Sequence, residues 1–483
     1  MMELRKLLEK VDMVKCSADI SSSVSGVSYD TRNICPGDIF VAIKGHSCDG
    51  HSFIPDAITK GASLVVCSKA PEAEIPYVLV MDSRKALAEI SAAWFGYPAE
   101  KMKMIGVTGT NGKTSVTNLI KNVLGTCTGK KVGLIGTNSN MIGDTEIETA
   151  LTTPESYELQ KLFSQMVEHE CTYCVMEVSS HALVLNRVHG ITFDIGVFTN
   201  LTQDHLDFHG TMQAYAQAKA ELFKISKISA INIDDQYSIV MKNAATGRVF
   251  SYAINDCCAD LSAKELKLSA GKAEFLALAV GSLARVELNI PGLFSVYNAL
   301  SVLAVTTLFE IDIKEAAAAL KTCGGVKGRA EVVPTNRDFS ILIDYAHTPD
   351  ALENILKAAQ SVTKGRVVAL FGCGGDRDKA KRPLMAQAAA QFSDFVIITS
   401  DNPRTEQPAA IIEDILKGMA DTQTQFTTIE NRRDAIKWSI ENAIKDDVII
   451  LAGKGHETYQ IIGKEKIHFD EREVVAEILK DAP

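Results

Sequence analysis

Short apolar runs alternate with longer amphipathic stretches along most of the chain. Two examples are DIGVFTN at 194–200 and DVIILAGKGHE at 447–457, in which a run rich in β-branched residues ends in polar residues. Short strands of this kind, separated by helical patterns, are typical of parallel-sheet α/β proteins. The pattern therefore predicts an α/β fold whose ligands bind at the carboxyl ends of the strands.

This pattern repeats in three parts. Residues 1–98 carry the strand-like GDIFVAIKG and ASLVVCS and end in a helix expected over 84–98, after which the charged AEKMK indicates a linker. Residues 99–328 carry five further predicted strands, a β-rich insertion near 248–292 and a long apolar helix. Residues 329–483 follow the glycine-rich CGGVKGRAE, repeat the scheme of strand and polar loop, and predict a Rossmann-like domain.

Composition and charge exclude several classes of protein. Apolar residues make up 46% of the chain and charged residues 23%, which is globular usage, and a formal net charge of −10 disfavours general nucleic-acid binding. The N-terminal MMELRKLLEKVDM lacks the apolar core of a signal peptide, and no segment is apolar enough to span a membrane, so we expect a cytoplasmic protein. Cys171 and Cys174 form an isolated C-x-x-C, for which core packing is favoured over metal binding.

The segment VTGTNGKTS, residues 107–115, has the features of a phosphate-binding loop. Gly109 and Gly112 allow close approach of the backbone, the following helix offers free N–H groups, Lys113 supplies a positive charge, and Thr114 can bind Mg²⁺. Val107 stands where the full Walker pattern has glycine, so the motif is a shortened variant. Its position between a strand and a helix favours phosphate binding over an incidental glycine turn.

Two polar residues follow later strands of the same part. Glu177 in MEVSSHA and His205 in TNLTQDHLDFHG could converge above the sheet, where a divalent ion such as Mg²⁺ would fit. Taken alone, the histidine is more readily interpreted as a capping or core residue.

Lys219 shares a helical face with Tyr215, Leu222 and Phe223 in YAQAKAELF. Such a lysine either extends along the apolar surface to solvent or is desolvated, in which case its pKa falls toward that of a reactive neutral amine. A neutral amine can react with CO₂ to form a carbamate, although the pattern alone favours the solvent-reaching alternative.

Motifs in a consistent order run through nearly the whole chain: GTNGKTS, TTPES, MEVSSHAL, FTNLTQDHLDFHG, AKAELF, GVKGRAE, DYAHTPDAL, GCGGDRDKAKRP, SDNPRTEQP and AGKGHE. Together they resemble the Mur ligases, and within that family the members that add meso-2,6-diaminopimelate to UDP-N-acetylmuramoyl-L-alanyl-D-glutamate. The resemblance implies an N-terminal domain at 1–98 for the uridine nucleotide, a central P-loop ATPase domain at 99–328, and a Rossmann-like C-terminal domain at 329–483 for the amino acid.

The resemblance implies a peptidoglycan-precursor ligase in which ATP phosphorylates the D-glutamyl carboxylate and an amine attacks the acyl phosphate. In the family's pattern Lys113, Glu177, His205 and Lys219 are catalytic, Lys219 is carbamylated, and the metal ligands are Thr114, Glu177, His205 and the carbamate. The implied ATP-binding residues are Gly109, Thr110, Asn111, Gly112, Lys113, Thr114, Ser115, Asn298, Arg329 and Asp344.

The resemblance also implies two further binding sites. Residues expected to bind the UDP-linked dipeptide are Tyr29, Thr31, His46, Ser47, Cys48, Thr152, Thr153, Ser179 and Arg187. Residues expected to bind diaminopimelate are Arg377, Asp401, Asn402, Pro403, Arg404, Gly453 and Glu457. The family usually has serine at Thr31 and asparagine at Ser295, and the second departure puts one nucleotide contact in doubt. From the residues alone, without the family resemblance, SYDTR at 28–32 and DNPR at 401–404 would be interpreted as ordinary polar turns.

Other functions stay open at this point. A lysine-adding relative or a folylpolyglutamate synthetase would share the loop, although the folate enzymes are not expected to carry DNPR. A non-catalytic nucleotide-binding regulator is disfavoured by the intact Lys113, Glu177, His205 and Lys219, and a nucleic-acid motor by the acidic charge. We expect a monomer that uses ATP and Mg²⁺.

Overall fold

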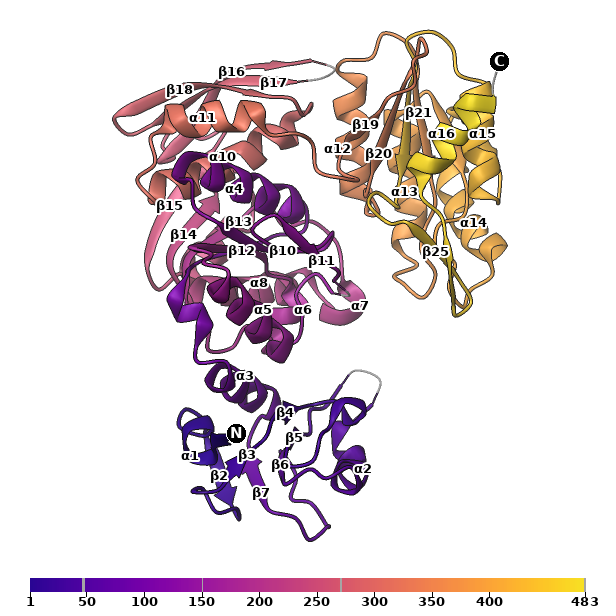
Figure 1. The fold of residues 1–483 in the computed structure, drawn as a ribbon. Helices are drawn as coiled ribbons and strands as arrows, with labels where there is room; N and C mark the ends of the chain where they lie inside the picture. The colour runs from indigo at the N-terminus through magenta and orange to yellow at the C-terminus, as the bar shows by residue number, and fades with distance from the viewer. Residues whose placement is uncertain (46–47, 150, 270–271, 482–483) are drawn as a thin grey trace.

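The computed structural model describes all residues except 46–47, 150, 270–271 and 482–483. Three sheets, of five, eleven and six strands, follow one another along the chain and form three units. In Figure 1 the N-terminal unit lies below the central unit, and the C-terminal unit lies beside the central one. The α/β fold with parallel sheets that the sequence predicts is confirmed.

The N-terminal unit is built on a sheet of order β2-β7-β6-β5-β4, parallel except at β2. The long helix predicted here ends at Trp94 instead of continuing to residue 98, because Gly96 and Tyr97 take left-handed φ values of 71° and 52°. Its elements are β1 (Met2–Glu3), α1 (Leu4–Leu7), β2 (Met13–Cys16), β3 (Ser23–Val24), β4 (Val27–Ser28), β5 (Ile39–Val41), α2 (Ile54–Thr59), β6 (Leu64–Cys67), β7 (Tyr77–Val80) and α3 (Ser83–Trp94).

The central unit has parallel strands in the order β9-β12-β8-β13-β14-β15-β16, extended by antiparallel strands at both edges. The β-rich insertion expected near 248–292 forms β15 to β18, which continue this sheet. The elements are β8 (Lys103–Thr108), α4 (Lys113–Thr128), β9 (Val132–Ile135), β10 (Asn140–Ile142), β11 (Thr145–Ile147), α5 (Ser156–Glu168), β12 (Tyr173–Glu177), α6 (Ser180–Val184), β13 (Phe193–Phe198), α7 (Leu206–His209), α8 (Met212–Lys224), β14 (Ser226–Asn232), α9 (Ser238–Ala244), β15 (Arg248–Ala253), β16 (Leu261–Leu268), β17 (Ala273–Ala279), β18 (Ser282–Leu288), α10 (Leu293–Leu308) and α11 (Ile313–Thr322).

The C-terminal unit has the sheet order β19-β20-β24-β21-β22-β23, with only β19 antiparallel. A separate hairpin, β25-β26, follows the last sheet strand. The elements are β19 (Glu331–Val333), β20 (Ser340–Asp344), α12 (Pro349–Gln360), β21 (Val367–Phe371), α13 (Lys381–Phe392), β22 (Phe395–Ile398), α14 (Pro408–Leu416), β23 (Gln425–Thr428), α15 (Arg432–Glu441), β24 (Val448–Ala452), β25 (Tyr459–Ile462), β26 (Glu465–His468) and α16 (Glu471–Asp481).

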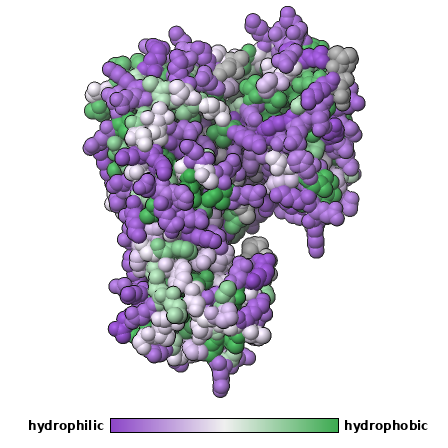
Figure 2. Space-filling view, in the orientation of Figure 1, coloured by the Kyte–Doolittle hydropathy of each residue, from purple (hydrophilic) through white to green (hydrophobic). Residues whose placement is uncertain are grey.

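Helices cover the two faces of the central and C-terminal sheets, which explains why their parallel strands are apolar on both sides. Cys171 and Cys174 are buried free thiols, as expected for core packing. The face in Figure 2 is mostly hydrophilic and is hollowed between the N-terminal unit and the C-terminal unit above it. In the part of the chain that the structure describes, no helix is both long and apolar enough to cross a membrane.

Candidate active site

The glycine-rich loop joins β8 to α4, as its pattern predicts. Gly112 caps α4 with a φ of 86°, and a Cβ there would lie 2.8 Å from Oδ1 of Asn298. A side chain at this position is therefore excluded both by backbone conformation and by space. Among the described residues no side chain caps the first turn of α4, so its N–H groups are available to an anionic ligand.

Two lysines, the buried Lys219 and the half-buried Lys113, meet at one carbonyl of this loop. Lys113 Nζ donates to the Gly109 oxygen at 3.0 Å, and Lys219 Nζ donates to the same oxygen at 2.8 Å. The side chain of Lys219 is only 1% exposed, so the solvent-reaching alternative for this residue is wrong. Burial, together with the nearby Lys113 charge, holds the pKa of Lys219 well below its usual range. Two desolvated cations on one acceptor favour a neutral Lys219 amine.

Glu177 reaches the start of α4 from the end of the neighbouring strand β12. Its Oε2 accepts hydrogen bonds from Thr114 Oγ1 and from Thr137 Oγ1, each at 3.1 Å, and its Oε1 accepts one from the Thr137 N–H at 2.8 Å. Carboxylate and hydroxyl oxygens at a helix N-terminus suit a hard cation, so Thr114 and Glu177 fit Mg²⁺. Thr137 was not predicted, since only the tertiary fold places its loop beside Glu177.

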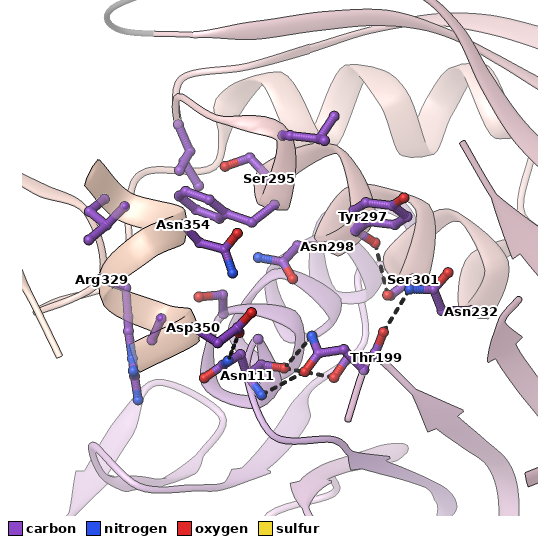
Figure 3. A pocket seen from close by; sticks show the side chains of 18 of the residues that line it. Asn111, Thr199, Asn232, Ser295, Tyr297, Asn298, Ser301, Arg329, Asp350 and Asn354 are labelled. Atoms are coloured by element: carbon purple, nitrogen blue, oxygen red, sulfur yellow. Dashed lines mark hydrogen bonds between the residues drawn. The ribbon is translucent and has the colours of Figure 1, made fainter. Parts of the chain in front are cut away.

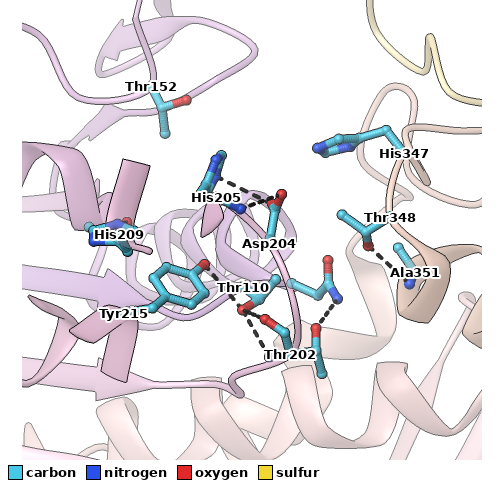
Figure 4. A network of polar contacts seen from close by, with 12 residues as sticks. Thr110, Thr152, Thr202, Asp204, His205, His209, Tyr215, His347, Thr348 and Ala351 are labelled. Atoms are coloured by element: carbon cyan, nitrogen blue, oxygen red, sulfur yellow. Dashed lines mark hydrogen bonds and ion pairs between the residues drawn. The ribbon is translucent and has the colours of Figure 1, made fainter. Parts of the chain in front are cut away.

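His205 lies on the other side of the glycine-rich loop, in a left-handed conformation with a φ of 54° (Figure 4). Its Nε2 lies 3.3 Å from the carboxylate of Asp204, and burial lowers the pKa of His205 to about 3 despite that carboxylate. Its neutral ring nitrogen is thus compatible with metal binding. His347, from the C-terminal unit, lies near Asp204, and burial lowers its pKa to about 4.

A cavity of about 310 Å³ lies between the central and C-terminal units beside this loop (Figure 3). It brings together six of the predicted ATP-binding residues, namely Asn111, Gly112, Ser115, Asn298, Arg329 and Asp344. Arg329 crosses from the C-terminal side and donates to Thr114 Oγ1 at 3.1 Å. Its buried Nε has no hydrogen-bond partner among the described residues, which leaves the guanidinium a donor for an anion.

Asp350, at the start of α12, is a residue of this cavity that the sequence did not indicate. Its carboxylate accepts hydrogen bonds from Asn111 Nδ2 at 2.6 Å and from Thr202 Oγ1 at 3.3 Å. Burial raises the pKa of Asp350 above its usual value. These bonds join the C-terminal unit directly to the glycine-rich loop and to the segment that follows β13.

The residues predicted to bind the UDP-linked dipeptide lie in two groups. Thr153, Ser179 and Arg187 are in contact in the central unit: Thr153 Oγ1 donates to Ser179 Oγ at 3.3 Å, and Arg187 donates to the Thr153 carbonyl at 2.9 Å. Thr152 lies beside them, where its hydroxyl lies 3.1 Å from that of Thr137. Tyr29 contacts Glu158 of the central unit at 2.9 Å.

A cavity of about 460 Å³ extends from Tyr29 between the N-terminal and central units. Its lining includes Glu148, Glu155, Glu158 and Lys161, and Glu155 forms ion pairs with Arg84 and Arg187. Thr31 is in the N-terminal unit and Cys48 is exposed, whereas His46 and Ser47 lie outside the described residues.

Most of the residues predicted to bind diaminopimelate cluster at the carboxyl ends of β22 and β24. Arg404 donates to the Gly375 carbonyl at 2.7 Å, and Asn402 Nδ2 donates to Glu457 Oε2 at 2.8 Å. Gly453 packs against the Asp401 carboxylate, and Pro403 is buried. Arg377 is exposed on the neighbouring loop.

The hairpin strand β25 fixes the shape of the DNPR loop. The Arg404 N–H donates to the Ile461 carbonyl at 3.1 Å, and the Gly463 N–H donates to the Arg404 carbonyl at 2.8 Å. These bonds hold Arg404 at a φ of 52°, which non-glycine residues rarely adopt. The sequence did not indicate this hairpin contact or the fully buried Lys454, whose Nζ lies 3.0 Å from Glu457.

The fold and this geometry define a three-part α/β protein with a glycine-rich loop facing a cavity at the junction of two units. Three family models match the chain: "Mur ligase family, catalytic domain" at residues 23–95, "Mur ligase middle domain" at 107–306, and "Mur ligase, glutamate ligase domain" at 328–455. The chain belongs to the Mur ligase family. The three-domain Mur ligase architecture predicted from the sequence is thereby confirmed.

The relatives share one name. The chain is 50% identical to UDP-N-acetylmuramoyl-L-alanyl-D-glutamate–2,6-diaminopimelate ligase of Caldanaerobacter subterraneus subsp. tengcongensis, over 95% of each chain. It is 48% identical to ligase 1 of that name from Clostridium acetobutylicum, over 99% of this chain and 100% of the relative. A solved structure of a ligase with this name superposes with a TM-score of 0.71 at 30% identity, over 99% of both chains.

Proposed function

We propose that this chain is an ATP-dependent amide ligase that adds meso-2,6-diaminopimelate to UDP-N-acetylmuramoyl-L-alanyl-D-glutamate, through an acyl phosphate, in peptidoglycan precursor synthesis. The observation that carries the catalytic part is the pair of lysines on the Gly109 carbonyl, the half-buried Lys113 and the buried Lys219. The names of relatives that match nearly the whole chain support the two substrates.

Each of the three units would bind a different substrate. Residues 1–98 would bind the uridine nucleotide with Tyr29, Thr31 and the segment 46–48, together with Thr152, Thr153, Ser179 and Arg187 of the central unit. Residues 99–328 would bind ATP, and residues 329–483 would bind the amino acid. The reacting groups would then meet at the junction of the units, where Arg329 and Asp350 already contact the glycine-rich loop.

The chain's own groups would activate the carboxylate and exclude water. Lys113 and the N–H groups of α4 would hold the phosphates, and Arg329 would add a second positive charge from the C-terminal side. Bound Mg²⁺, held by Thr114, Glu177 and His205, would neutralise charge on the phosphates. Closure of the junction between the units would protect an acyl phosphate from hydrolysis.

Lys219 is proposed to act as a carbamate. A neutral amine is the form that reacts with CO₂, and burial beside Lys113 favours that form. The carbamate carries a negative charge, so it would replace a repulsion between two lysines by an attraction to Lys113 and supply a further oxygen ligand for Mg²⁺.

The amino-acid site would recognise both ends of meso-diaminopimelate. The Arg404 guanidinium can bind the distal carboxylate with two parallel hydrogen bonds, and Arg377 can reach a carboxylate from the neighbouring loop. Asp401 and Glu457 would bind the distal ammonium, while Asn402, Gly453 and Pro403 shape the loop around them. L-lysine lacks the distal carboxylate and would leave Arg404 without a partner.

A panel of amino acids tests this proposal. Phosphate release from ATP is measured with Mg²⁺, with or without the UDP-linked dipeptide, and with meso-diaminopimelate, L-lysine or no amino acid. We expect release that requires both the dipeptide and an amino acid and that is fastest with meso-diaminopimelate. A preference for L-lysine would assign the chain to lysine addition, and release independent of either substrate would reject the ligase.

A further inference from the structure

We propose that Lys454 is a positioning residue for the amino-acid site: it holds Glu457 and Asn402 in place, and Glu457 in turn binds the distal ammonium of the amino acid. This inference rests on the proposed function, because the diaminopimelate site is itself a proposal. It adds a residue that does not touch the substrate but decides how tightly one end of it is held.

Three side chains form a closed set of contacts behind the DNPR loop. Lys454 Nζ lies 3.0 Å from Glu457 Oε2 and 3.3 Å from Asn402 Oδ1. Asn402 Nδ2 completes the set by donating to the same Glu457 oxygen at 2.8 Å. The Asn402 oxygen also accepts from the Ile461 N–H at 3.0 Å, which fixes the orientation of the amide. Each of the three side chains is thus held by the other two.

Burial separates the roles of these residues. The Lys454 side chain is 0% exposed, so it cannot contact an incoming amino acid without a rearrangement. The Glu457 side chain keeps 11% of its surface exposed. In the part of the chain that the structure describes, the hydrogen bonds to its carboxylate end on Oε2. Oε1 is therefore left to accept from a ligand ammonium.

A fully buried lysine is rare unless its charge is paired. Here the charge stabilises the ionised carboxylate of Glu457 and fixes its rotamer. Without it, Glu457 would be a nearly buried anion with only the Asn402 amide as its partner, and its side chain would rotate. The ion pair with the ligand ammonium then weakens, and this ammonium is remote from the amine that reacts. The expected effect is therefore on KM for the amino acid rather than on kcat.

Steady-state kinetics of the full chain test the inference with Lys454→Met and a matched control, Lys464→Met, whose lysine is exposed in the hairpin turn of the same unit. For Lys454→Met we expect KM for meso-diaminopimelate to rise at least about tenfold, with kcat and the KM values for ATP and the UDP-linked dipeptide within about threefold of wild type. Lys464→Met should match wild type. An unchanged KM for meso-diaminopimelate, or a loss shared equally by all three substrates, would overturn the positioning role.

A double-mutant cycle with Glu457→Gln tests whether Lys454 acts through Glu457. The double variant should have the same KM for meso-diaminopimelate as Glu457→Gln alone, whereas additive losses would show that Lys454 acts independently. Lys454→Met alone leaves the Glu457 carboxylate without its partner and could fail to fold. The double variant removes the lysine charge and the carboxylate charge together, so its comparison with Glu457→Gln still decides the question. A wild-type chain that forms no amide with meso-diaminopimelate would reject the proposed function, whereas an active wild type with additive losses would reject this inference alone.

Discussion

Replacing Arg404 by alanine should remove the preference for meso-diaminopimelate while leaving the rest of the site intact. Arg404 lies half-buried in the loop between β22 and α14, and its side chain donates to the Gly375 carbonyl at 2.7 Å. The backbone of the loop is held separately, by bonds of the Arg404 N–H to Ile461 and of the Gly463 N–H to Arg404. Alanine keeps those backbone bonds, so the change is confined to the guanidinium.

The size of the loss in kcat/KM depends on how many N–H donors of the Arg404 guanidinium are not already used within the protein. Arginine carries five N–H donors, and the bond to Gly375 uses one of them. Two others can bind the distal carboxylate in parallel. Losing one partner of a desolvated charged pair costs about 2 to 5 kcal/mol, and the smaller value already lowers kcat/KM about thirtyfold. L-lysine has no distal carboxylate, so its kcat/KM should not fall.

The assay is phosphate release with each amino acid for wild type, Arg404→Ala and the control Arg433→Ala. Arg433 is an exposed residue of α15 that pairs with Glu477 at 2.8 Å, away from the DNPR loop. We expect only Arg404→Ala to lose at least about thirtyfold in kcat/KM for meso-diaminopimelate. Two results would contradict this role of Arg404: a kcat/KM within about threefold of wild type, or a parallel fall with L-lysine.

Three further substitutions test other parts of the structure. Lys219→Ala should abolish ligation, with high bicarbonate having no effect and a short carboxylic acid partly restoring activity by replacing the carbamate; full activity in product assays would rule out that role. Lys113→Ala should slow ADP formation by about 10²- to 10³-fold, because a charge that meets the transferring phosphoryl group is lost, and normal ADP formation would reject the loop assignment. Glu471→Gln should lower the free energy of unfolding by about 3 to 5 kcal/mol, because it leaves the buried Arg432 without its carboxylate partner; an unchanged urea midpoint would contradict this.

The sequence predicts the fold and much of the geometry of the site because strand ends carry the polar residues. Glu177 ends β12, which pairs directly with β8, the strand before the glycine-rich loop, so adjacency in the sheet brings Glu177 to Thr114. In the C-terminal sheet β21 separates β22 from β24, but the carboxyl ends of these parallel strands lie at the same edge, so the DNPR loop after β22 lies close to Glu457 after β24. The sequence pattern alone predicts the wrong environment for Lys219, because a helical pattern does not show that the glycine-rich loop covers the amine of this lysine.

Features that depend on contacts between segments far apart in the sequence could not be predicted from the residue pattern. Asp350 reaches Asn111 only because the C-terminal unit is placed against the central one. Lys454 has the sequence context of an ordinary glycine-flanked loop lysine, and its burial follows from the folding of the DNPR loop and of the β25-β26 hairpin over it. The left-handed backbone of Arg404 likewise depends on pairing with β25, for which the local sequence carries no signal.

The most direct measurement follows the oxygen atoms of the activated carboxylate. The UDP-linked dipeptide is labelled with oxygen-18 in its D-glutamyl carboxylate and incubated with ATP, Mg²⁺ and meso-diaminopimelate, and the released phosphate is analysed by mass spectrometry. Because an acyl phosphate leaves with one oxygen of the carboxylate, each amide bond formed should yield one phosphate molecule that carries a single oxygen-18 atom. Amide formation accompanied by unlabelled phosphate would contradict carboxylate activation by ATP.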